Sequence, residues 1–389
     1  MSDHAIEQLL ELLVIDGPPG GEKIVADTIR RQLLEAGVGE DAISEDRAQE
    51  QSEYGGDTGN LIVRLDGDGQ DPRRLFSCHM DTIPNAVGCA PEREGERIIN
   101  KAPGKALGGD NRPACAILLE AARALVARQG DQAPTTLAFL IQEEVGLVGA
   151  RGLDTAMLGP SLPAMGFNFD GGRADRLVMA VIGAECFTID LSGIEAHAGA
   201  HPEQGASCAV MFARALHELV EGGWHGLIEQ PGGRGSANLG ILTGGQGSNV
   251  VMPRLQILAE ARSHDPSFRR TIIDVWQNAF RRAATETRNA AGDGGVATFG
   301  SGPTYEVFAL AEDEPAVQQA LGVAAGLDLA AVCESNNGGM DANWLTDHGI
   351  PTITIGCGQR QVHTTEEWID LTDFRRACAF ATGLAVAGR

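Results

Sequence analysis

The chain has 389 residues, which is longer than one hydrophobic core usually grows, and this length predicts two domains. Its 43% hydrophobic and 21% charged residues are those of an ordinary globular protein. The formal net charge of −23 argues against a nucleic-acid partner, because the phosphates would repel the chain.

The N-terminus and the cysteines predict the compartment. The first residues contain no basic segment followed by an apolar run, so we expect no signal peptide. No stretch approaches the roughly 20 apolar residues that a membrane helix needs, which argues against a membrane partner. The eight cysteines are scattered without a CxxC pair, a pattern typical of reduced thiols. We therefore expect a cytoplasmic protein.

The outer parts of the chain alternate helical apolar spacing with short apolar runs, which is typical of α/β proteins. Helices are predicted at residues 6–15, 22–36 and 114–125. Strands are predicted at residues 61–65, 75–78, 137–141, 166–169 and 352–355.

The middle of the chain has a different pattern. Strands are predicted at 186–191, 237–242, 255–261 and, as one strand or two, at 296–299 and 305–308. Helices are predicted at 206–220 and 268–287. The resulting order β-α-β-β-α-β is that of a ferredoxin-like unit. We therefore predict an inserted domain at residues 183–309, between two parts of a first domain at 1–182 and 310–389.

Acids and histidines gather where the predicted strands of the first domain end. They are His79, Asp81, Glu143, Glu144, Asp170 and His363, together with Asp110 after a Gly108-Gly109 turn. Open α/β sheets bind ligands beyond the carboxyl ends of their strands, so we expect these side chains to meet at one edge.

These residue types fit a pair of zinc ions. Zinc binds imidazole nitrogen and carboxylate oxygen, and a catalytic site leaves one position for water. Two ions roughly 3.5–4 Å apart would share a bridging water, lower its pKa and polarise an amide carbonyl. Asp81 could reach the far imidazole nitrogen of His79 and fix its tautomer. Of two adjacent glutamates, one would bind metal and its neighbour would carry a proton to the leaving amine.

Each feature alone also has an ordinary structural explanation. An HxD triplet or a Glu-Glu pair is usually unrelated to metal. Asp110 could cap a helix, Asp170 could be a turn residue, and His363 could be a surface histidine. The metal hypothesis rests on the occurrence of all of them together, in this order along the chain.

Five segments resemble the peptidase T, carboxypeptidase G2 and aminoacylase-1 family of two-zinc hydrolases. They are CHMDT at 78–82, GGDN at 108–111, QEEVG at 142–146, DGG at 170–172 and GGMDAN at 338–343. The resemblance runs from His79 to His363. It implies a mixed-sheet α/β catalytic domain with an inserted ferredoxin-like lid and dimerisation domain.

The resemblance also implies a role for each matching residue. Asp110 would bridge both metals. His79 and Asp170 would complete one metal site, and Glu144 and His363 the other. Asp81 would orient His79, and Glu143 would be the general base. Family members often have a cis peptide after the bridging aspartate, which here is Asp110-Asn111.

The inserted domain contains a second match. Residues 194–205 resemble the family's lid segment, in which the histidine matching His197 reaches the active site of a neighbouring subunit and steadies the oxyanion. Asn249 and Arg262 match lid positions associated with substrate contact. The resemblance therefore implies a homodimer. The ordinary explanations are an exposed loop for His197 and a surface ion pair for Arg262.

The segment Asn337-Gly338-Gly339 bears on the choice of substrate. Its backbone N–H groups could bind a substrate carboxylate, or the segment could simply be a turn. The GGMDAN segment and residues 362–367 look closest to the peptidase T-like branch, which implies an aminopeptidase acting on tripeptides or other short peptides. Peptidase T has an arginine where this chain has Asn337, and an amide grips a carboxylate less strongly. A dipeptide, a longer peptide or an N-acyl amino acid therefore stays open.

Three alternatives complete the prediction. An N-acyl-amino-acid deacylase or a carboxypeptidase would use the same metal chemistry. A non-catalytic peptide- or metal-binding relative would lack a ligand or the base, and all are present. A dinucleotide-binding oxidoreductase is excluded because no GxGxxG follows an early strand. Two Zn²⁺ ions per subunit are expected, although Co²⁺ or Mn²⁺ would accept the same ligands.

Overall fold

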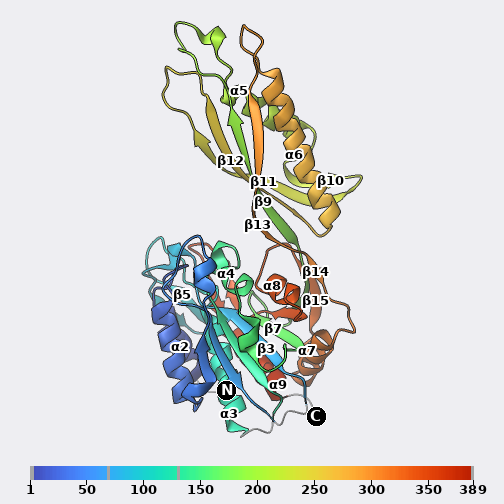
Figure 1. Ribbon diagram of the computed structural model, residues 1–389. Coiled ribbons are helices and arrows are strands. Elements are labelled where there is room, and N and C mark those ends of the chain that lie inside the picture. The colour runs from blue at the N-terminus through green and yellow to red at the C-terminus, as the bar shows by residue number, and fades with distance from the viewer. Residues whose placement is uncertain (1–3, 68–70, 129–131, 387–389) are drawn as a thin grey trace. The chain divides into compact units, whose positions relative to one another are not determined.

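The computed structural model describes residues 4–67, 71–128 and 132–386, and the chain divides into two compact units (Figure 1). Unit 1 consists of residues 1–181 and 309–389, and unit 2 consists of residues 182–308. Unit 2 is thus one continuous segment inserted between the two parts of unit 1. Each unit has its own hydrophobic core.

Within the described residues, unit 1 is built on a nine-stranded sheet. Its order is β1 (Ile43–Glu45), β2 (Leu61–Leu65), β6 (Thr135–Leu140), β3 (Arg74–His79), β7 (Met165–Phe169), β16 (Thr352–Ile355), β8 (Arg176–Val181) and β14 (Phe308–Ala309), with β15 (Val332–Asn336) paired to β8. Strand β3 is parallel to β6 and β7, and β7 is parallel to β16, whereas β2 and β8 are antiparallel to their neighbours β6 and β16. The predicted mixed α/β sheet is confirmed.

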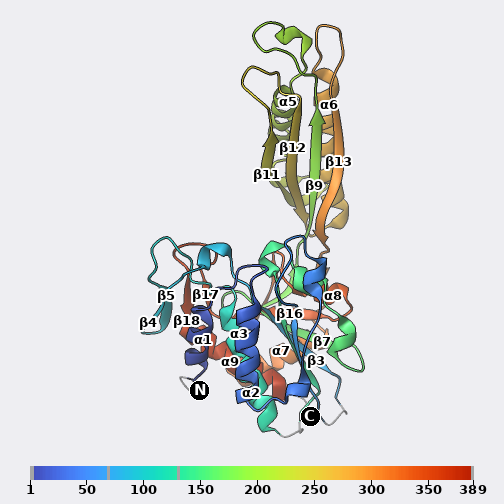
Figure 2. The ribbon, with the colours of Figure 1, turned by 60° about the vertical axis from the view of Figure 1, so that its left-hand side comes forward.

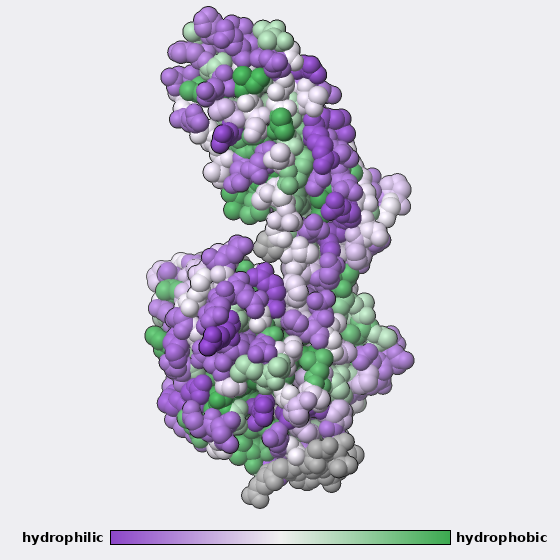
Figure 3. Space-filling model, viewed as in Figure 1, coloured by the Kyte–Doolittle hydropathy of each residue, from purple (hydrophilic) through white to green (hydrophobic). Residues whose placement is uncertain are grey.

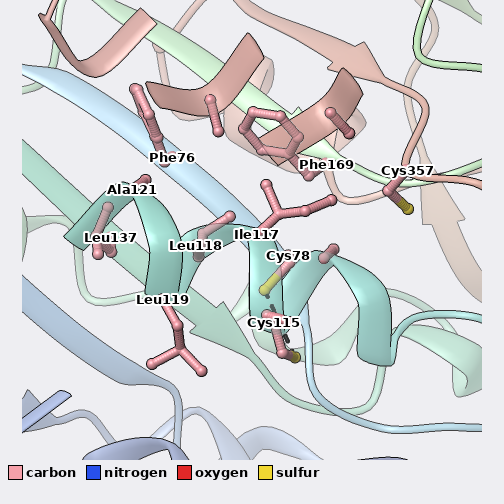
Figure 4. Packing of buried hydrophobic residues seen from close by; sticks show 14 of the residues in the cluster. Phe76, Cys78, Cys115, Ile117, Leu118, Leu119, Ala121, Leu137, Phe169 and Cys357 are labelled. Carbon is pink, nitrogen blue, oxygen red and sulfur yellow. Dashed lines mark hydrogen bonds between the residues drawn. The ribbon is translucent and has the colours of Figure 1, made fainter. Parts of the chain in front are cut away.

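Helices cover both faces of this sheet, because alternate residues of a strand face opposite sides. On β3, Phe76 and Cys78 join the larger core, whereas Leu75 joins a smaller one. Helices α1 (His4–Leu13), α2 (Lys23–Glu35), α3 (Arg112–Ala127), α7 (Pro315–Gly326) and α9 (Leu371–Val386) contribute to the larger core, and α4 (Val148–Arg151) and α8 (Ala342–Asp347) to the smaller. Figure 4 shows Phe76 of β3 and Ile117 of α3 in the larger core. Burial on both faces explains the continuous apolar runs of the central strands.

The parallel strands end at a common edge of the sheet. In the register of the sheet, Cys78 pairs with Phe139, and Phe169 pairs with Ile355. The segments that follow β3, β6, β7 and β16 therefore leave the sheet along the same edge.

A smaller sheet of unit 1 is absent from the sequence-based prediction. Its order is β17 (Gln359–Arg360), β18 (Trp368–Asp370), β5 (Arg97–Asn100) and β4 (Pro91–Glu94). These strands have two to four residues, too few for an alternating pattern to be recognised. His363 was expected to follow β16 directly, but it lies in the loop between β17 and β18. The small sheet therefore holds both ends of the loop that carries His363.

Unit 2 has a five-stranded antiparallel sheet in the order β10 (Gly226–Gln230), β11 (Gly233–Gly244), β12 (Arg254–Ser263), β9 (Gly183–Ser192) and β13 (Val296–Tyr305). Helices α5 (Cys208–Glu221) and α6 (Pro266–Glu286) lie on one side of it and share a core with it (Figure 2).

Unit 2 differs from the predicted β-α-β-β-α-β order by one added strand, and its last element, predicted as one strand or two, is a single strand. Strand β10 was missed because only Ile228 is buried among its five residues. The last strand is β13, which runs unbroken through Gly300 and Gly302 with an irregularity between Ser301 and Thr304. The chain therefore forms one long strand at 296–305 and only a two-residue strand, β14, at 308–309.

The surface and the helices agree with the composition. The face in view in Figure 3 is mainly hydrophilic, with its hydrophobic residues in separate small groups. Among the described residues, no helix combines the length and the apolar character needed to cross a membrane.

Gly149, in α4, packs directly against the end of β6. A Cβ atom there would lie 2.5 Å from Asn60 Oδ1 and 2.5 Å from the Ile141 carbonyl oxygen. We expect Gly149→Ala to lower the free energy of unfolding by about 1–3 kcal/mol, the usual cost of overpacking, as measured by denaturant unfolding.

Gly322→Ala, in α7, is the matched control, because a Cβ there meets no atom within 4 Å. Alanine favours a helix over glycine, so this variant should gain roughly 0.5–1 kcal/mol. Equal stabilities of the two variants would contradict the close packing of α4 on β6.

Candidate active site

His79 is the last residue of β3, and its ring is buried. Its Nδ1 atom lies 3.3 Å from Asp81 Oδ1 and 3.2 Å from the Asp81 carbonyl oxygen. Its Nε2 atom lies 3.0 Å from Asp110 Oδ1. Asp81 thus holds a proton on Nδ1, and Nε2 is left to face Asp110 and to bind a cation.

The core beneath His79 fixes its backbone. The Cys115 thiol of α3 donates a hydrogen bond to the His79 carbonyl oxygen (3.4 Å) and lies 3.8 Å from the Cys78 sulfur (Figure 4). The buried Arg112 guanidinium donates to the Met80 carbonyl oxygen at 2.6 Å. The turn that carries His79 and Asp81 is therefore tied to the start of α3.

Asp110 lies between the two histidines. Its Oδ1 atom faces His79, and its Oδ2 atom lies 3.3 Å from His363 Nε2. The peptide bond Asp110-Asn111 is cis, as the family resemblance implies. Asn111 occupies the N-cap position of α3, so the explanation of Asp110 as a helix cap is wrong. Its carboxylate instead offers one oxygen to each histidine.

Glu367 holds the Asp110 loop in place. Its Oε2 atom accepts hydrogen bonds from the N–H groups of Leu107 and Gly108, both at 2.8 Å, and its Oε1 atom accepts one from the Asp110 N–H at 3.0 Å. Because Glu367 is four residues from His363, it connects the segments that carry two candidate ligands. Sequence reasoning did not assign it a role.

Glu143 and Glu144 follow β6 through a turn in which Gln142 has a φ of 51°. Three successive backbone N–H groups of this turn donate to carboxylates. Gln142 donates to Glu22 Oε1 (3.0 Å), Glu143 to Asp81 Oδ1 (3.0 Å) and Glu144 to Asp81 Oδ2 (3.1 Å). Asp81 therefore positions both His79 and the two glutamates, and Glu22 has a supporting role that the sequence did not reveal.

His363 completes the cluster from an exposed loop. Its Nε2 atom lies 3.1 Å from Glu144 Oε1 and 3.0 Å from Glu144 Oε2. Its φ of 64° is in the left-handed region, which turns the ring back toward Asp110 and Glu144.

Asp170 follows β7, and its N–H donates to the Ile355 carbonyl oxygen at 3.0 Å. Its Oδ1 atom accepts a hydrogen bond of 3.1 Å from Gln359 Nε2, which also lies 3.2 Å from Asp110 Oδ1. Gln359 was missed because nothing in the sequence marks a glutamine in a two-residue strand as part of a site. The structure therefore brings together Asp81, Glu143 and all five predicted ligands.

The cluster is electrostatically strained without a cation. Burial and the charge of Asp110 raise the pKa of Asp170 to about 7. Burial raises the pKa of Glu143 well above its usual range, and the nearby carboxylates add to this. Burial would also raise the pKa of Asp110, but hydrogen bonds from His363 and His79 hold it well below its usual range.

The histidines are shifted in the opposite sense. Burial alone would lower the pKa of His79, but hydrogen bonds to Asp110 and Asp81 raise it well above the ordinary value. Hydrogen bonds to Asp110 and Glu144 raise the pKa of His363 to about 10.

A further buried acid supports the same conclusion. Asp341 lies within the GGMDAN segment, and both of its carboxylate oxygens are buried without a hydrogen-bond partner. Burial raises its pKa to about 8, and nearby Asp170 and Asp81 add to the rise. The carboxylates in this part of the fold thus carry more negative charge, when ionised, than the two imidazoles and the Arg112 guanidinium could neutralise.

The donor set fits divalent cations. His79, Asp110 and Glu144 each offer a ligand atom, and these atoms lie within 4.8 Å of one another. Imidazole nitrogen and carboxylate oxygen are the ligands that zinc and its transition-metal neighbours accept. Positive ions at this position would relieve the repulsion among the buried carboxylates.

The remaining predicted residues lie elsewhere. His197, Asn249 and Arg262 belong to unit 2. His197 and Asn249 are exposed, and the Asn249 carbonyl oxygen accepts a hydrogen bond from the Ala198 N–H (2.9 Å). Arg262 makes a two-point ion pair with Glu260, at 3.1 Å for each bond, which agrees with the ordinary explanation for it.

The Asn337-Gly338-Gly339 segment lies in unit 1. The Gly338 N–H donates to Asn336 Oδ1 at 3.0 Å, and Asn337 is exposed. A pocket of about 340 Å³ lies beside Asp170, and Asn336 and Met340 line it from the two ends of this segment.

Histidines and carboxylates arranged around one shared aspartate, at the carboxyl edge of an α/β sheet, define a metal-dependent hydrolase. Residues 75–387 match the model of peptidase family M20/M25/M40, and the chain belongs to this family. The family predicted from the sequence is therefore confirmed.

Three relatives are similar over nearly the full length. The uncharacterized protein YqjE of Bacillus subtilis (strain 168) is 29% identical over 364 residues, which cover 93% of this chain and 92% of that protein. The structure of aminopeptidase PepT from Bacillus cereus matches with a TM-score of 0.82 and 26% identity, covering 98% of this chain and 97% of that chain. A tripeptidase from Staphylococcus aureus matches with a TM-score of 0.85 and 24% identity, covering 98% and 96%.

Metal loading should release protons. Without metal, the pKa of His363 is raised to about 10 and that of His79 is raised well above its ordinary value, so both rings favour the protonated form. Metal binding requires neutral imidazoles and ionised carboxylates, so we expect the number of protons released to include about one from His363 and further contributions from His79 and from Asp170, whose pKa is about 7, and we expect the apparent affinity to rise with pH. Isothermal titration in buffers of different protonation enthalpy measures this number. A binding heat that is independent of the buffer would contradict the assignment of the histidines as ligands.

Proposed function

We propose that this chain is an aminopeptidase that uses two zinc ions per subunit to release the N-terminal residue from tripeptides or other short peptides. The observation that carries the proposal is the placement of Asp110, which gives one carboxylate oxygen to each of two histidines. The similarity to PepT and to a tripeptidase supports a peptide substrate. All eight cysteines are free thiols, which supports a cytoplasmic location.

Each ion would have its own ligands. His79 and Asp170 would hold one ion, and Glu144 and His363 the other, with Asp110 between them. When bound, the two ions would supply Lewis acidity that polarises the scissile carbonyl and lowers the pKa of the attacking water. Cobalt or manganese would serve as substitutes.

Glu143 would carry the proton. Its backbone is fixed by Asp81, and burial raises its pKa, which makes its carboxylate a stronger proton acceptor. It would take this proton from the attacking water and pass it to the nitrogen of the leaving amine.

His197 would stabilise the developing oxyanion in the active site of a partner subunit. Its Nδ1 atom accepts hydrogen bonds from the N–H groups of Gly199 (3.2 Å) and Ala200 (3.1 Å). The ring proton is therefore on Nε2, which is the donor that an oxyanion needs. This role makes the protein a homodimer in which each site uses a residue of the other chain.

The substrate would extend from the ions into the pocket beside Asp170. Arg176, Glu334 and Asn336 supply polar groups at its wall, and Val178 and Met340 supply apolar ones. We propose that Asn337, Gly338 and Gly339 contact the peptide near this pocket and that Asn249 and Arg262 are further substrate-binding residues.

Two variants test the base and the shared site together. Glu143→Gln keeps the size of the side chain but loses the base, so we expect turnover to fall by about 10²–10⁴-fold while both metals stay bound. His197→Ala should also be strongly impaired. When the two variants are mixed and allowed to exchange subunits, activity should return to about a quarter of wild type, because about half of the dimers then hold one intact site.

The control is each variant mixed with itself, which should stay inactive. No recovery in the mixture, although subunit exchange is shown by a labelled chain, would place His197 in its own subunit's site, and full activity of His197→Ala alone would place it outside catalysis. Near-normal turnover of Glu143→Gln would mean that the base is another group.

A peptide panel tests the substrate. Metal-stripped protein is assayed with and without zinc, cobalt or manganese on matched di-, tri- and tetrapeptides, their N-acetylated forms and an N-acetyl amino acid. We expect metal-dependent release of the first residue from free tripeptides and not from blocked ones, because the proposed site requires a free N-terminus.

The other outcomes assign the alternatives. Cleavage of only the acetylated compounds would make the protein a deacylase, and release of the last residue would make it a carboxypeptidase. No cleavage by the fully metal-loaded protein would favour a binding protein without catalysis.

A further inference from the structure

Gln359 has an unusual place in the cluster. It is the first residue of β17, and its side chain is only 3% exposed. It is an uncharged residue that contacts two of the acids at the site, Asp110 and Asp170. A buried amide at such a position must satisfy both its donor and its acceptor groups.

Its orientation is fixed by the loop after β7. Gln359 Oε1 accepts a hydrogen bond of 3.0 Å from the Gly171 N–H, so the amide nitrogen must point the other way. There Nε2 faces three oxygens, at 2.9 Å from Asn111 Oδ1, 3.1 Å from Asp170 Oδ1 and 3.2 Å from Asp110 Oδ1. The two N–H hydrogens of the amide are thus directed at the side chains that surround the cis peptide and at Asp170.

These contacts lie on one side of Asp110. Gln359 and His79 both meet Asp110 at Oδ1, whereas His363 meets it at Oδ2. Gln359 therefore belongs to the half of the cluster that contains His79 and Asp170. Glu144 faces His363 in the other half of the cluster. Among the described residues, no hydrogen bond joins Gln359 to Glu144.

The chemistry of an amide suits this position. Two buried carboxylates repel each other, and a cationic side chain between them would neutralise the charge that attracts a metal. An amide N–H group holds the carboxylate oxygens at a fixed separation without adding a charge. It thereby orients both carboxylates for a cation without cancelling the negative charge that would attract it.

We propose that Gln359 is a positioning residue for one metal only: it holds Asp110 and Asp170 in the orientation that binds the ion on the His79 side, and it sets the affinity of that ion relative to the ion on the His363 side. This inference rests on the proposed two-metal function.

Two substitutions separate the hydrogen bonds that the Gln359 amide donates from the volume that its side chain occupies. Gln359→Met keeps the length of the side chain and removes every hydrogen bond. Gln359→Glu keeps an oxygen that can accept from the Gly171 N–H, but it replaces the donating nitrogen with a second acceptor that faces Asp110 and Asp170. Gln361→Met is the matched control, because the same exchange occurs two residues along at an exposed side chain.

The measurement is titration of the metal-free full-length protein with Co²⁺, followed by calorimetry and by the visible absorption of the bound ions. We expect two binding steps per subunit in the wild type and in Gln361→Met. In Gln359→Met and in Gln359→Glu, one step should weaken by about 10–100-fold, the usual effect of removing a group that orients metal ligands, and the other step should stay unchanged. The unfolding midpoint of each variant shows whether the fold is intact.

Three results would overturn the inference. Wild-type affinities in both Gln359 variants would show that the amide does not position ligands. Recovery in Gln359→Glu alone would show that the contact with Gly171, and not the donation to carboxylates, is what matters. Equal weakening of both steps would show that Gln359 supports the whole site and not one half. Binding of fewer than two ions per subunit by the wild-type protein would refute the two-metal function itself. This outcome is separate, because it is measured on the wild type and not on the Gln359 variants.

Discussion

Buried carboxylates repel one another at the carboxyl edge of the sheet, and unit 1 must hold them together against this repulsion. Asp110, Glu143, Glu144, Asp170 and Asp341 influence one another's ionisation within one part of the fold. Burial raises the pKa of Glu143, Asp170 and Asp341, which means that the charged forms are disfavoured in the metal-free protein. The same arrangement would give a divalent cation its affinity, because the ion would remove the repulsion.

The polypeptide holds these acids in place mainly through backbone N–H groups. Asp81 accepts two of them at the Glu143-Glu144 turn, Glu22 accepts one at Gln142, and Glu367 accepts three around Asp110. Such donors add no net charge, so they orient the site without competing with a cation for it. The side-chain amide of Gln359 applies the same principle to Asp110 and Asp170.

The meeting of His79, Glu143, Glu144 and Asp170 at one edge of the sheet could be predicted from the sequence, because each of them comes just after an apolar run. Histidines and acids that follow apolar runs converge when those runs are parallel strands of one sheet, and β3, β6, β7 and β16 are such strands. The long apolar segments were also predicted closely, with 61–65 and 352–355 matching β2 and β16.

The supporting residues could not be predicted, because their partners are distant in sequence and belong to the backbone. Glu22 acts on Gln142, 120 residues away, and Glu367 acts on Asp110, 257 residues away. Neither carboxylate differs in the sequence from an ordinary surface acid. The short strands β10, β17 and β18 were missed for a different reason: they have two to five residues each, too few to show a clear periodicity.

The central claim is that Asp110 is shared by two metal ions, and anomalous diffraction from zinc-loaded crystals tests it most directly. The account predicts two anomalous peaks on either side of the Asp110 carboxylate, one about 2.0–2.2 Å from His79 and Asp170 and the other at a similar distance from Glu144 and His363. A single peak, or two peaks that do not share Asp110, would contradict it.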